Sequence, residues 1–240
     1  MPESKLSRRL HAAFLLVREG KRIADIGTDH ALLPIALVKS GKCPHAIASD
    51  INKLPLEKAS ENISREGLSK KIETYLTNGA VGLEGRAEDY VIAGMGGELI
   101  AEIISESPFL KSCDIHLVLQ PMTKISTLRR FLWENGFNIN NEVYLEDMGH
   151  FYTVISSSYT GVNFEYTPLE AEVGLEIFRK NADEDSLRAL GGEIRIKLFD
   201  LDNKIRGKNT AGKNAEEERS MRDMLINTLR EIERKIYEAL

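Results

Sequence analysis

The pattern of hydrophobic and polar positions in this chain changes once, near residue 165. From residue 21 to about 120, short apolar and β-branched runs alternate with longer amphipathic stretches, a pattern typical of βαβ units around a parallel sheet. It predicts an α/β fold with parallel strands at 21–26, 45–50, 71–76, 89–94 and 114–120. The predicted helices lie at 31–41, 53–67, 96–106 and 123–135.

Two further strands follow the last of these helices. The runs 137–147 and 150–159 flank Met148-Gly149, an arrangement typical of an antiparallel hairpin at the edge of a sheet. The predicted sheet is therefore seven-stranded and mostly parallel.

The strand pattern stops at Pro168, and apolar residues then recur at steps of three and four, which predicts two long helices. Their apolar positions are Leu187, Leu190, Ile194, Leu198, Leu201 and Ile205, then Leu225, Leu229, Ile232, Ile236 and Ala239. The Gly-, Asn- and Lys-rich segment 203–215 is predicted as the turn of a helical hairpin that packs as a coiled coil. We therefore expect two domains, 1–160 and 166–240.

Composition places the protein among ordinary globular chains. It has 240 residues with a mean hydropathy of −0.26, and it lacks the roughly 20 uninterrupted apolar residues of a membrane helix. No secretory leader pattern is recognisable at the amino terminus. Cys43 and Cys113 have no metal-ligand spacing, so neither a disulfide framework nor a metal site is expected. The expected location is the cytoplasm, with no membrane contact.

Charge is unevenly distributed along the chain. The net charge is −5, yet residues 1–53 carry nine basic and five acidic side chains. The predicted turn 203–215 is basic as well and contains no acid. Such segments are either solvated surface or contacts for a phosphate backbone. The candidate contacts are Lys5, Arg8 and Arg9 at the amino terminus and Lys204, Arg206, Lys208 and Lys213 in the turn.

The candidate chemistry begins where the first strand ends, at the sequence D-I-G-T-D-H over 25–30. Ligands of parallel α/β sheets bind beyond the carboxyl ends of the strands, and Gly27 allows the backbone to approach one closely. Asp50 follows Asp25 at about the spacing at which a carboxylate binds ribose hydroxyls. Asp29 stands where a dinucleotide motif has its second glycine, and its charge would repel a pyrophosphate. That charge suits the positive groups of S-adenosylmethionine instead.

Three motifs together give a specific resemblance: D-I-G-T-D-H at 25–30, I-A-G-M-G-G at 92–97 and L-Q-P-M at 119–122. With them, residues 4–158 resemble the bacterial tRNA (adenine(22)-N1)-methyltransferase family. The resemblance implies a Rossmann-like class I methyltransferase domain followed by a coiled coil. It also implies an S-adenosylmethionine-dependent enzyme that methylates N1 of adenine 22 in tRNA.

The resemblance also assigns site residues. It implies that the cofactor contacts Asp25, Gly27, Asp29, Asp50, Asn78, Gly79, Ala93, Gly94 and Met95. Of these, Asp50 would bind the ribose and Asn78-Gly79 the adenine edge. The candidates for the reacting side of the pocket are Asp29, His30, Gln120 and Pro121. Gln120 offers both a donor and an acceptor to the edge of a flipped base.

Each assignment has a structural alternative. Asp29 is also a candidate helix cap, His30 a structural hydrogen-bonding group, and the glycines near 94 and the Gln120-Pro121 pair simple turns. Other functions also remain open: an S-adenosylmethionine enzyme acting on a small molecule or protein, a non-catalytic nucleotide-binding module, or a dehydrogenase. The sequence carries no indication of oligomeric state.

Overall fold

The computed structural model describes residues 6–175 and 183–238, so Lys5 lies outside the described residues. The chain divides into two compact units. The first contains residues 1–143 and 153–165, and the second contains 144–152 and 166–240. The tip of the predicted β-hairpin, residues 144–152, thus groups with the C-terminal helices, although no sequence signal indicated this. The predicted division into 1–160 and 166–240 as independently folding domains stays a prediction.

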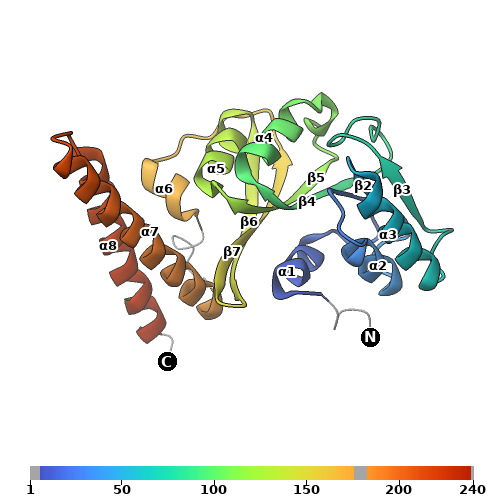
Figure 1. Cartoon of the computed structure of the whole chain (residues 1–240), viewed down its shortest axis with the longest axis horizontal. Helices are drawn as coiled ribbons and strands as arrows, with labels where there is room; N and C mark the ends of the chain where they lie inside the picture. Colours follow the sequence, from blue (N-terminus) through green and yellow to red (C-terminus); the bar gives the residue numbers. More distant parts are fainter. Residues whose placement is uncertain (1–5, 176–182, 239–240) are drawn as a thin grey trace. The chain divides into compact units, whose positions relative to one another are not determined.

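The first unit is built on a seven-stranded sheet in the order β3-β2-β1-β4-β5-β7-β6 (Figure 1). The strands are β1 Ile23–Ile26, β2 Ala46–Asp50, β3 Ile72–Leu76, β4 Asp89–Gly96, β5 His116–Thr123, β6 Phe137–Asp147 and β7 His150–Tyr159. The first five pair in parallel, and β7 pairs antiparallel with β5. This order confirms the predicted Rossmann-like fold, and the reversal between β1 and β4 is where such sheets bind ligands.

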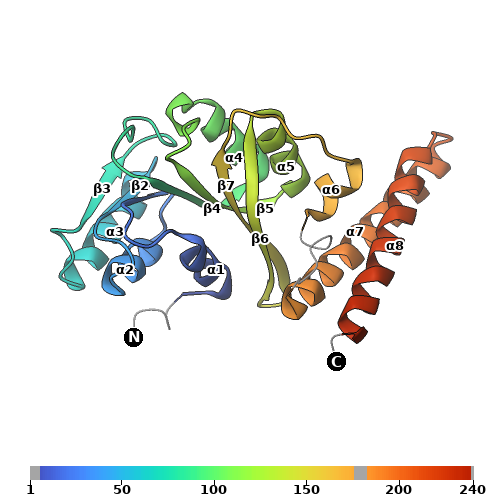
Figure 2. The same cartoon turned by 180° about the vertical axis from the view of Figure 1, so that it is seen from behind.

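Helices cover both faces of this sheet, as Figures 1 and 2 show. One face carries α1 Arg8–Leu16, α2 Leu32–Lys39 and α3 Lys53–Arg65; the other carries α4 Gly97–Ser105, α5 Ile125–Glu134 and a short 3₁₀ helix, Pro108–Leu110. Because both faces are covered, β1 is buried at every residue, while β4 and β5 are buried up to their carboxyl ends. Of these helices, α1 was not predicted from the sequence, although Ser7 caps it by accepting a hydrogen bond from Leu10 N.

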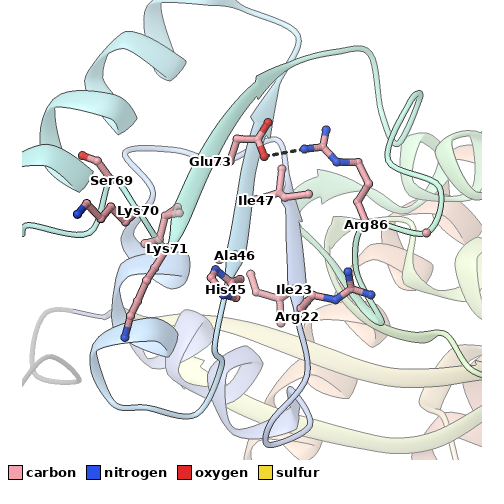
Figure 3. Close-up of a pocket in the computed structure, with 12 residues that line it drawn as sticks. Arg22, Ile23, His45, Ala46, Ile47, Ser69, Lys70, Lys71, Glu73 and Arg86 are labelled. Atoms are coloured by element: carbon pink, nitrogen blue, oxygen red, sulfur yellow. Dashed lines mark hydrogen bonds and ion pairs between the residues drawn. The ribbon is translucent and has the colours of Figure 1, made fainter.

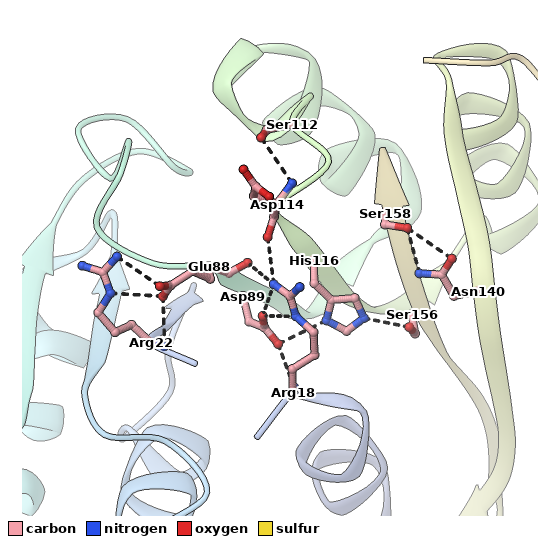
Figure 4. A network of polar contacts seen from close by, with 10 residues as sticks. All are labelled: Arg18, Arg22, Glu88, Asp89, Ser112, Asp114, His116, Asn140, Ser156 and Ser158. Carbon is pink, nitrogen blue, oxygen red and sulfur yellow. Dashed lines mark hydrogen bonds and ion pairs between the residues drawn. The ribbon is translucent and has the colours of Figure 1, made fainter. Parts of the chain in front are cut away.

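A buried polar network joins the amino ends of β4 and β5 to the segment after α1 (Figure 4). Asp89 is fully buried and accepts hydrogen bonds from Arg18 N and Nε, both at 2.8 Å. His116 Nδ1 lies 3.2 Å from Asp89 Oδ2, and its Nε2 lies 2.8 Å from Ser156 Oγ. Burial alone would raise the pKa of Asp89, but hydrogen bonds from His116 and Arg18 outweigh it and lower the pKa below its usual value.

We expect Asp89→Ala to destabilise the protein by about 3–5 kcal/mol, because it leaves the Arg18 and His116 side chains without their buried partner. Urea unfolding at pH 7 measures this loss. Since the folded-state pKa of Asp89 is lowered, its contribution in the wild type is present above about pH 4 and is lost as the pH falls below that value. A variant that matches the wild type at pH 7 would show that the network contributes no net stability.

The second unit is helical, with α6 Pro168–Val173, α7 Glu184–Thr210 and α8 Glu216–Glu238. Its core joins the two long helices to the hairpin tip through Tyr144, Leu190 and Leu225 among others. Tyr144 Oη also donates a 2.7 Å hydrogen bond to Val173 O. The long helices pack along each other as the sequence predicted, and their 27 and 23 residues correspond to about 40 and 35 Å.

The predicted turn at 203–215 is wrong in extent, because α7 continues through Thr210 and only 211–215 connects it to α8. Three of the four basic residues assigned to the turn therefore lie on the helix. Lys204 and Lys208 reach Glu218 in the first turn of α8, at 3.0 and 2.7 Å. Hydrogen bonds from Lys208 and Lys204 lower the pKa of Glu218 to about 2.

Candidate active site

The site begins at the carboxyl ends of β1 and β2, which are joined by hydrogen bonds just before the chain leaves the sheet. Thr28 N donates to Ser49 O at 2.8 Å, and the buried Ser49 hydroxyl donates to Asp25 O at 3.2 Å. These bonds fix the turn at 27–30 against β2, so the residues of the first motif are held by the sheet itself.

Asp25 is the buried carboxylate of the site, with 7% of its surface exposed. Burial raises its pKa to about 6; the neighbouring Thr28 hydroxyl offsets part of the rise, and the charge of Asp50 adds to it. Thr28 Oγ1 is itself buried and makes no hydrogen bond of ordinary geometry to the described residues. A buried carboxylate with a raised pKa, beside a buried hydroxyl without an ordinary hydrogen bond, forms an environment that a cationic, hydrogen-bonding ligand would stabilise.

Asp29 and His30 stand at the mouth of this turn. Asp29 Oδ1 lies 3.1 Å from His30 Nε2, with side chains 84% and 40% exposed. His30 and Ala31 both adopt positive φ, at 59° and 55°, and Asn62 Nδ2 donates to His30 O at 3.1 Å. The N-cap of α2 is Ala31, with no side-chain cap hydrogen bond. Asp29 therefore does not cap α2, and its carboxylate faces solvent at the carboxyl edge of the sheet.

The end of β4 supplies the floor expected from the second motif. Ala93 and Met95 are half-buried, and between them Gly94 is exposed with a φ of 81°, where the pairing with β5 is irregular. A Cβ on Gly27 would collide with the Met95 side chain. Met95 would have to move its flexible end to admit that Cβ, and the φ of Gly27, 73°, is a backbone conformation that residues with a side chain rarely adopt.

The ends of β2 and β3 form the third side. Asp50 Oδ1 accepts a 2.7 Å hydrogen bond from Asn52 N, while Asn78 is exposed and Gly79 has a φ of 56°. Sequence reasoning missed the apolar side chains beside them, Ile51, Leu76 and Val81, which are 61%, 58% and 57% exposed. Ile51 follows β2 and Leu76 ends the neighbouring β3, so both side chains offer apolar surface at the carboxyl edge of the sheet, of the kind that packs against a flat ring.

Gln120 and Pro121 lie at the same edge but are buried. Gln120 Oε1 accepts hydrogen bonds from Gly94 N at 3.1 Å and from Arg9 Nη1 at 3.0 Å. Its Nε2 donates to Pro121 O at 3.0 Å. The predicted contact between Gln120 and a target base would require these bonds to be exchanged, so the structure favours a role for Gln120 in holding the strand ends together.

S-Adenosylmethionine fits the residues present at this edge. The buried Thr28 hydroxyl and the Asp25 carboxylate suit its positive methionine end, the Asp50 carboxylate can accept from hydroxyl groups such as those of a ribose, and the apolar side chains at the strand ends suit an adenine ring. The sequence-predicted residues of β1, β2, β3 and β4 thus meet at one edge of the sheet.

A separate cavity of about 510 Å³ lies away from this edge, at the amino ends of β1, β2 and β3 (Figure 3). Basic side chains line much of it, and Arg86 Nη2 pairs with Glu73 Oε2 at 2.6 Å across its rim. Its place at the opposite ends of the strands separates it from the motif residues.

Within the described parts of the chain, no helix is both long and apolar enough to cross a membrane.

Comparison with known proteins agrees with this geometry. A family model described as "Methyltransferase domain" matches residues 6–155. The tRNA (adenine(22)-N(1))-methyltransferase of Bacillus subtilis is 32% identical over 176 residues, which cover 73% of this chain and 74% of that protein.

Two solved structures are similar over nearly the whole chain. The B. subtilis M1A22 tRNA methyltransferase TrmK has a TM-score of 0.76 and 27% identity, with 97% of this chain and 99% of that one covered. M. capricolum TrmK in complex with S-adenosyl-homocysteine has a TM-score of 0.73 and 26% identity, with 96% and 97% covered.

Proposed function

This chain belongs to the tRNA (adenine(22)-N(1))-methyltransferase family, and from that membership we propose that it methylates N1 of adenine 22 in tRNA with S-adenosylmethionine as methyl donor. The observation that carries the proposal is the meeting of the three family motifs at the carboxyl edge of the sheet, with Asp25 in β1, Asp29 in the turn after it and Asp50 at the end of the neighbouring β2. The agreement with full-length relatives over both units supports tRNA over a smaller substrate.

In this proposal Asp25 and the Thr28 hydroxyl bind the methionine end of the cofactor, and Gly27 and Gly94 leave room for it. Asp50 binds the ribose, while Ile51 and Leu76 flank the adenine, whose edge lies near Asn78-Gly79. When bound, S-adenosylmethionine supplies an electrophilic methyl group. The residues of this chain orient the acceptor nitrogen toward that group and keep the pocket rigid.

The acceptor needs little chemical assistance. N1 of an unpaired adenine already has a nucleophilic lone pair, and a positive charge develops on the ring as the new bond forms. Asp29, exposed and 3.1 Å from His30, is placed to stabilise that charge electrostatically. His30 holds the carboxylate at the mouth of the pocket, where the flipped base would enter.

We expect Asp50→Ala to weaken binding of S-adenosylhomocysteine by about 1–3 kcal/mol, because it removes a charge-assisted hydrogen bond to the ribose. Isothermal titration calorimetry measures the change. The same variant should melt within a few degrees of the wild type, since Asp50 is only half-buried. Unchanged affinity would remove Asp50 from the cofactor site.

The tRNA contacts are proposed from exposed cations. Arg8 on α1 and Arg206 and Lys213 near the α7–α8 turn are exposed, whereas Lys204 and Lys208 are paired with Glu218. The pairing lowers the electrostatic attraction that those two lysines offer to phosphates. Of the four basic residues predicted at the α7–α8 turn, Arg206 and Lys213 are therefore the principal candidates.

We expect the double variant Arg206→Ala/Lys213→Ala to raise the KM for tRNA and to reduce the slope of log KM against log salt, because two fewer phosphates are neutralised. Affinity for S-adenosylhomocysteine should not change. Lys58→Ala/Arg65→Ala, which removes two exposed cations of α3, is the matched control. Equal salt slopes for the tip variant and the wild type would rule out a phosphate contact at the tip.

Incubation with unmodified tRNA and labelled S-adenosylmethionine, followed by nucleoside analysis, tests the function itself. The expected product is 1-methyladenosine. Label in N6-methyladenosine, in another nucleoside, or only in protein would contradict the proposal. The proposal also places the protein in the cytoplasm with its tRNA substrate, where the free thiols of Cys43 and Cys113 would stay reduced.

A further inference from the structure

The Arg9 side chain links helix α1 to the candidate active site. Its Nη1 donates a 3.0 Å hydrogen bond to Gln120 Oε1, 111 residues away in the sequence. The same oxygen accepts from Gly94 N at 3.1 Å, and a Cβ on Gly94 would lie 3.7 Å from Arg9 Nη1. The guanidinium therefore lies against the exposed glycine at the end of β4.

Gln120 is suited to a fixed role between these groups. Its side chain is fully buried, both lone pairs of Oε1 are used by Arg9 and Gly94, and Nε2 is bound to Pro121 O at 3.0 Å. A buried amide with its hydrogen bonds satisfied holds one orientation, because releasing any of them leaves an unpaired polar group. Gly94, whose φ is 81°, is thus held in a conformation that its own sequence leaves free.

The other end of α1 is anchored as well, so Arg9 does not depend on a loose helix. Lys42 Nζ donates to Phe14 O and Leu15 O at 2.8 and 3.0 Å, and Arg18 is bound to the buried Asp89. Arg9 in α1 thus meets Gly94 near the carboxyl end of β4 through Gln120, and Arg18, just after α1, meets Asp89 at the amino end of the same strand.

We infer that Arg9 is a positioning residue for methyl transfer, acting through Gln120 to fix the Gly94 turn on which the acceptor base must be aligned. This inference rests on the proposed function and deepens it, because the family motifs assign no role to α1. It also separates Arg9 from Arg8, its exposed neighbour on the same helix, for which no hydrogen bond links the side chain to the strand ends among the described residues.

Two single variants test the inference, because each removes one guanidinium from the same turn of α1. Arg9→Ala should lower kcat on tRNA by about 10- to 30-fold, as a misplaced acceptor does, with KM and the affinity for S-adenosylhomocysteine within about threefold of wild type. Arg8→Ala should leave kcat unchanged and alter only KM and its salt dependence. In a Gln120→Met background, Arg9→Ala should cause little further loss of kcat, since the two residues act as a unit.

Amide hydrogen exchange of the peptide over residues 92–97 gives a readout that does not depend on tRNA. Arg9→Ala should accelerate exchange there, whereas Arg8→Ala should not. If Arg9→Ala raises KM with kcat and exchange unchanged, Arg9 is an ordinary phosphate contact and the inference is overturned. If Arg9→Ala abolishes cofactor binding, its role is structural and the inference is likewise overturned. If the wild type does not methylate tRNA, yet Arg9→Ala still accelerates exchange at 92–97, the proposed function is refuted and Arg9 is shown only to order the Gly94 turn.

Discussion

Replacing Asp25 by Asn is expected to weaken the binding of S-adenosylhomocysteine by at least about 10-fold while making the free protein more stable at pH 8. Binding weakens because a charge-assisted hydrogen bond to the cofactor's ammonium group is worth about 1.5–3 kcal/mol. Stability rises because burial, partly offset by Thr28 and reinforced by Asp50, raises the pKa of Asp25 from 3.8 to about 6. The ionised side chain therefore costs the free protein up to about 3 kcal/mol above pH 6.

The pH dependence fixes the sign of this effect. A carboxyl group with a raised folded-state pKa destabilises the protein above that pKa, so the wild type should gain stability as the pH falls from about 6 toward 4. The Asn variant should lack that gain. Urea unfolding at several pH values, with Asp200→Asn on the exposed face of α7 as control, measures the difference. A variant that is less stable than the wild type at pH 8 would show that Asp25 is a structural carboxylate.

Replacing Asp29 by Asn should lower kcat on tRNA by about 100-fold, because the carboxylate stabilises the positive charge that develops on the base. Affinity for S-adenosylhomocysteine should change by less than about threefold, since this ligand binds without the base on which that charge develops. Stability should stay within about 0.5 kcal/mol of the wild type, because the side chain is 84% exposed and does not cap α2.

Steady-state kinetics beside calorimetry separate these quantities, and Asp114→Asn, an exposed position outside the site, is the matched control. If Asp29→Asn reduces stability and leaves kcat unchanged, the residue supports the turn and not the reaction. Loss of cofactor affinity in proportion to kcat would instead assign Asp29 to the methionine end of the pocket.

Much of this architecture could be predicted because the local signals agree with the tertiary fold. The hairpin strands fall at the predicted 137–147 and 150–159, and the parallel strands begin and end within three residues of prediction. Alternating apolar runs and crossover helices define these elements locally. The common location of the motif residues of β1, β2 and β4 could be predicted as well, because the carboxyl ends of parallel strands lie at one edge of the sheet.

The missed features depend on long-range contacts. Helix α7 continues into the predicted turn, where Lys204 and Lys208 pair with Glu218 of the next helix, and no local pattern encodes these pairs. The sequence suggested that the Gln120 amide is available to a base, whereas in the fold its Oε1 accepts hydrogen bonds from Arg9 and Gly94. The exposed Ile51 and Leu76 could not be assigned to the site from the sequence, because it does not show that the ends of β2 and β3 are neighbours.

The central claim is that this chain methylates one adenine of tRNA, and paired transcripts test it most directly. An unmodified tRNA transcript with adenine at position 22 and the same transcript with guanine there are incubated with the protein and labelled S-adenosylmethionine. We predict label in 1-methyladenosine for the adenine transcript, with a reverse-transcription stop at position 22, and background label for the guanine transcript. Equal label in both transcripts, or none in either from a protein that binds the cofactor, would contradict the claim.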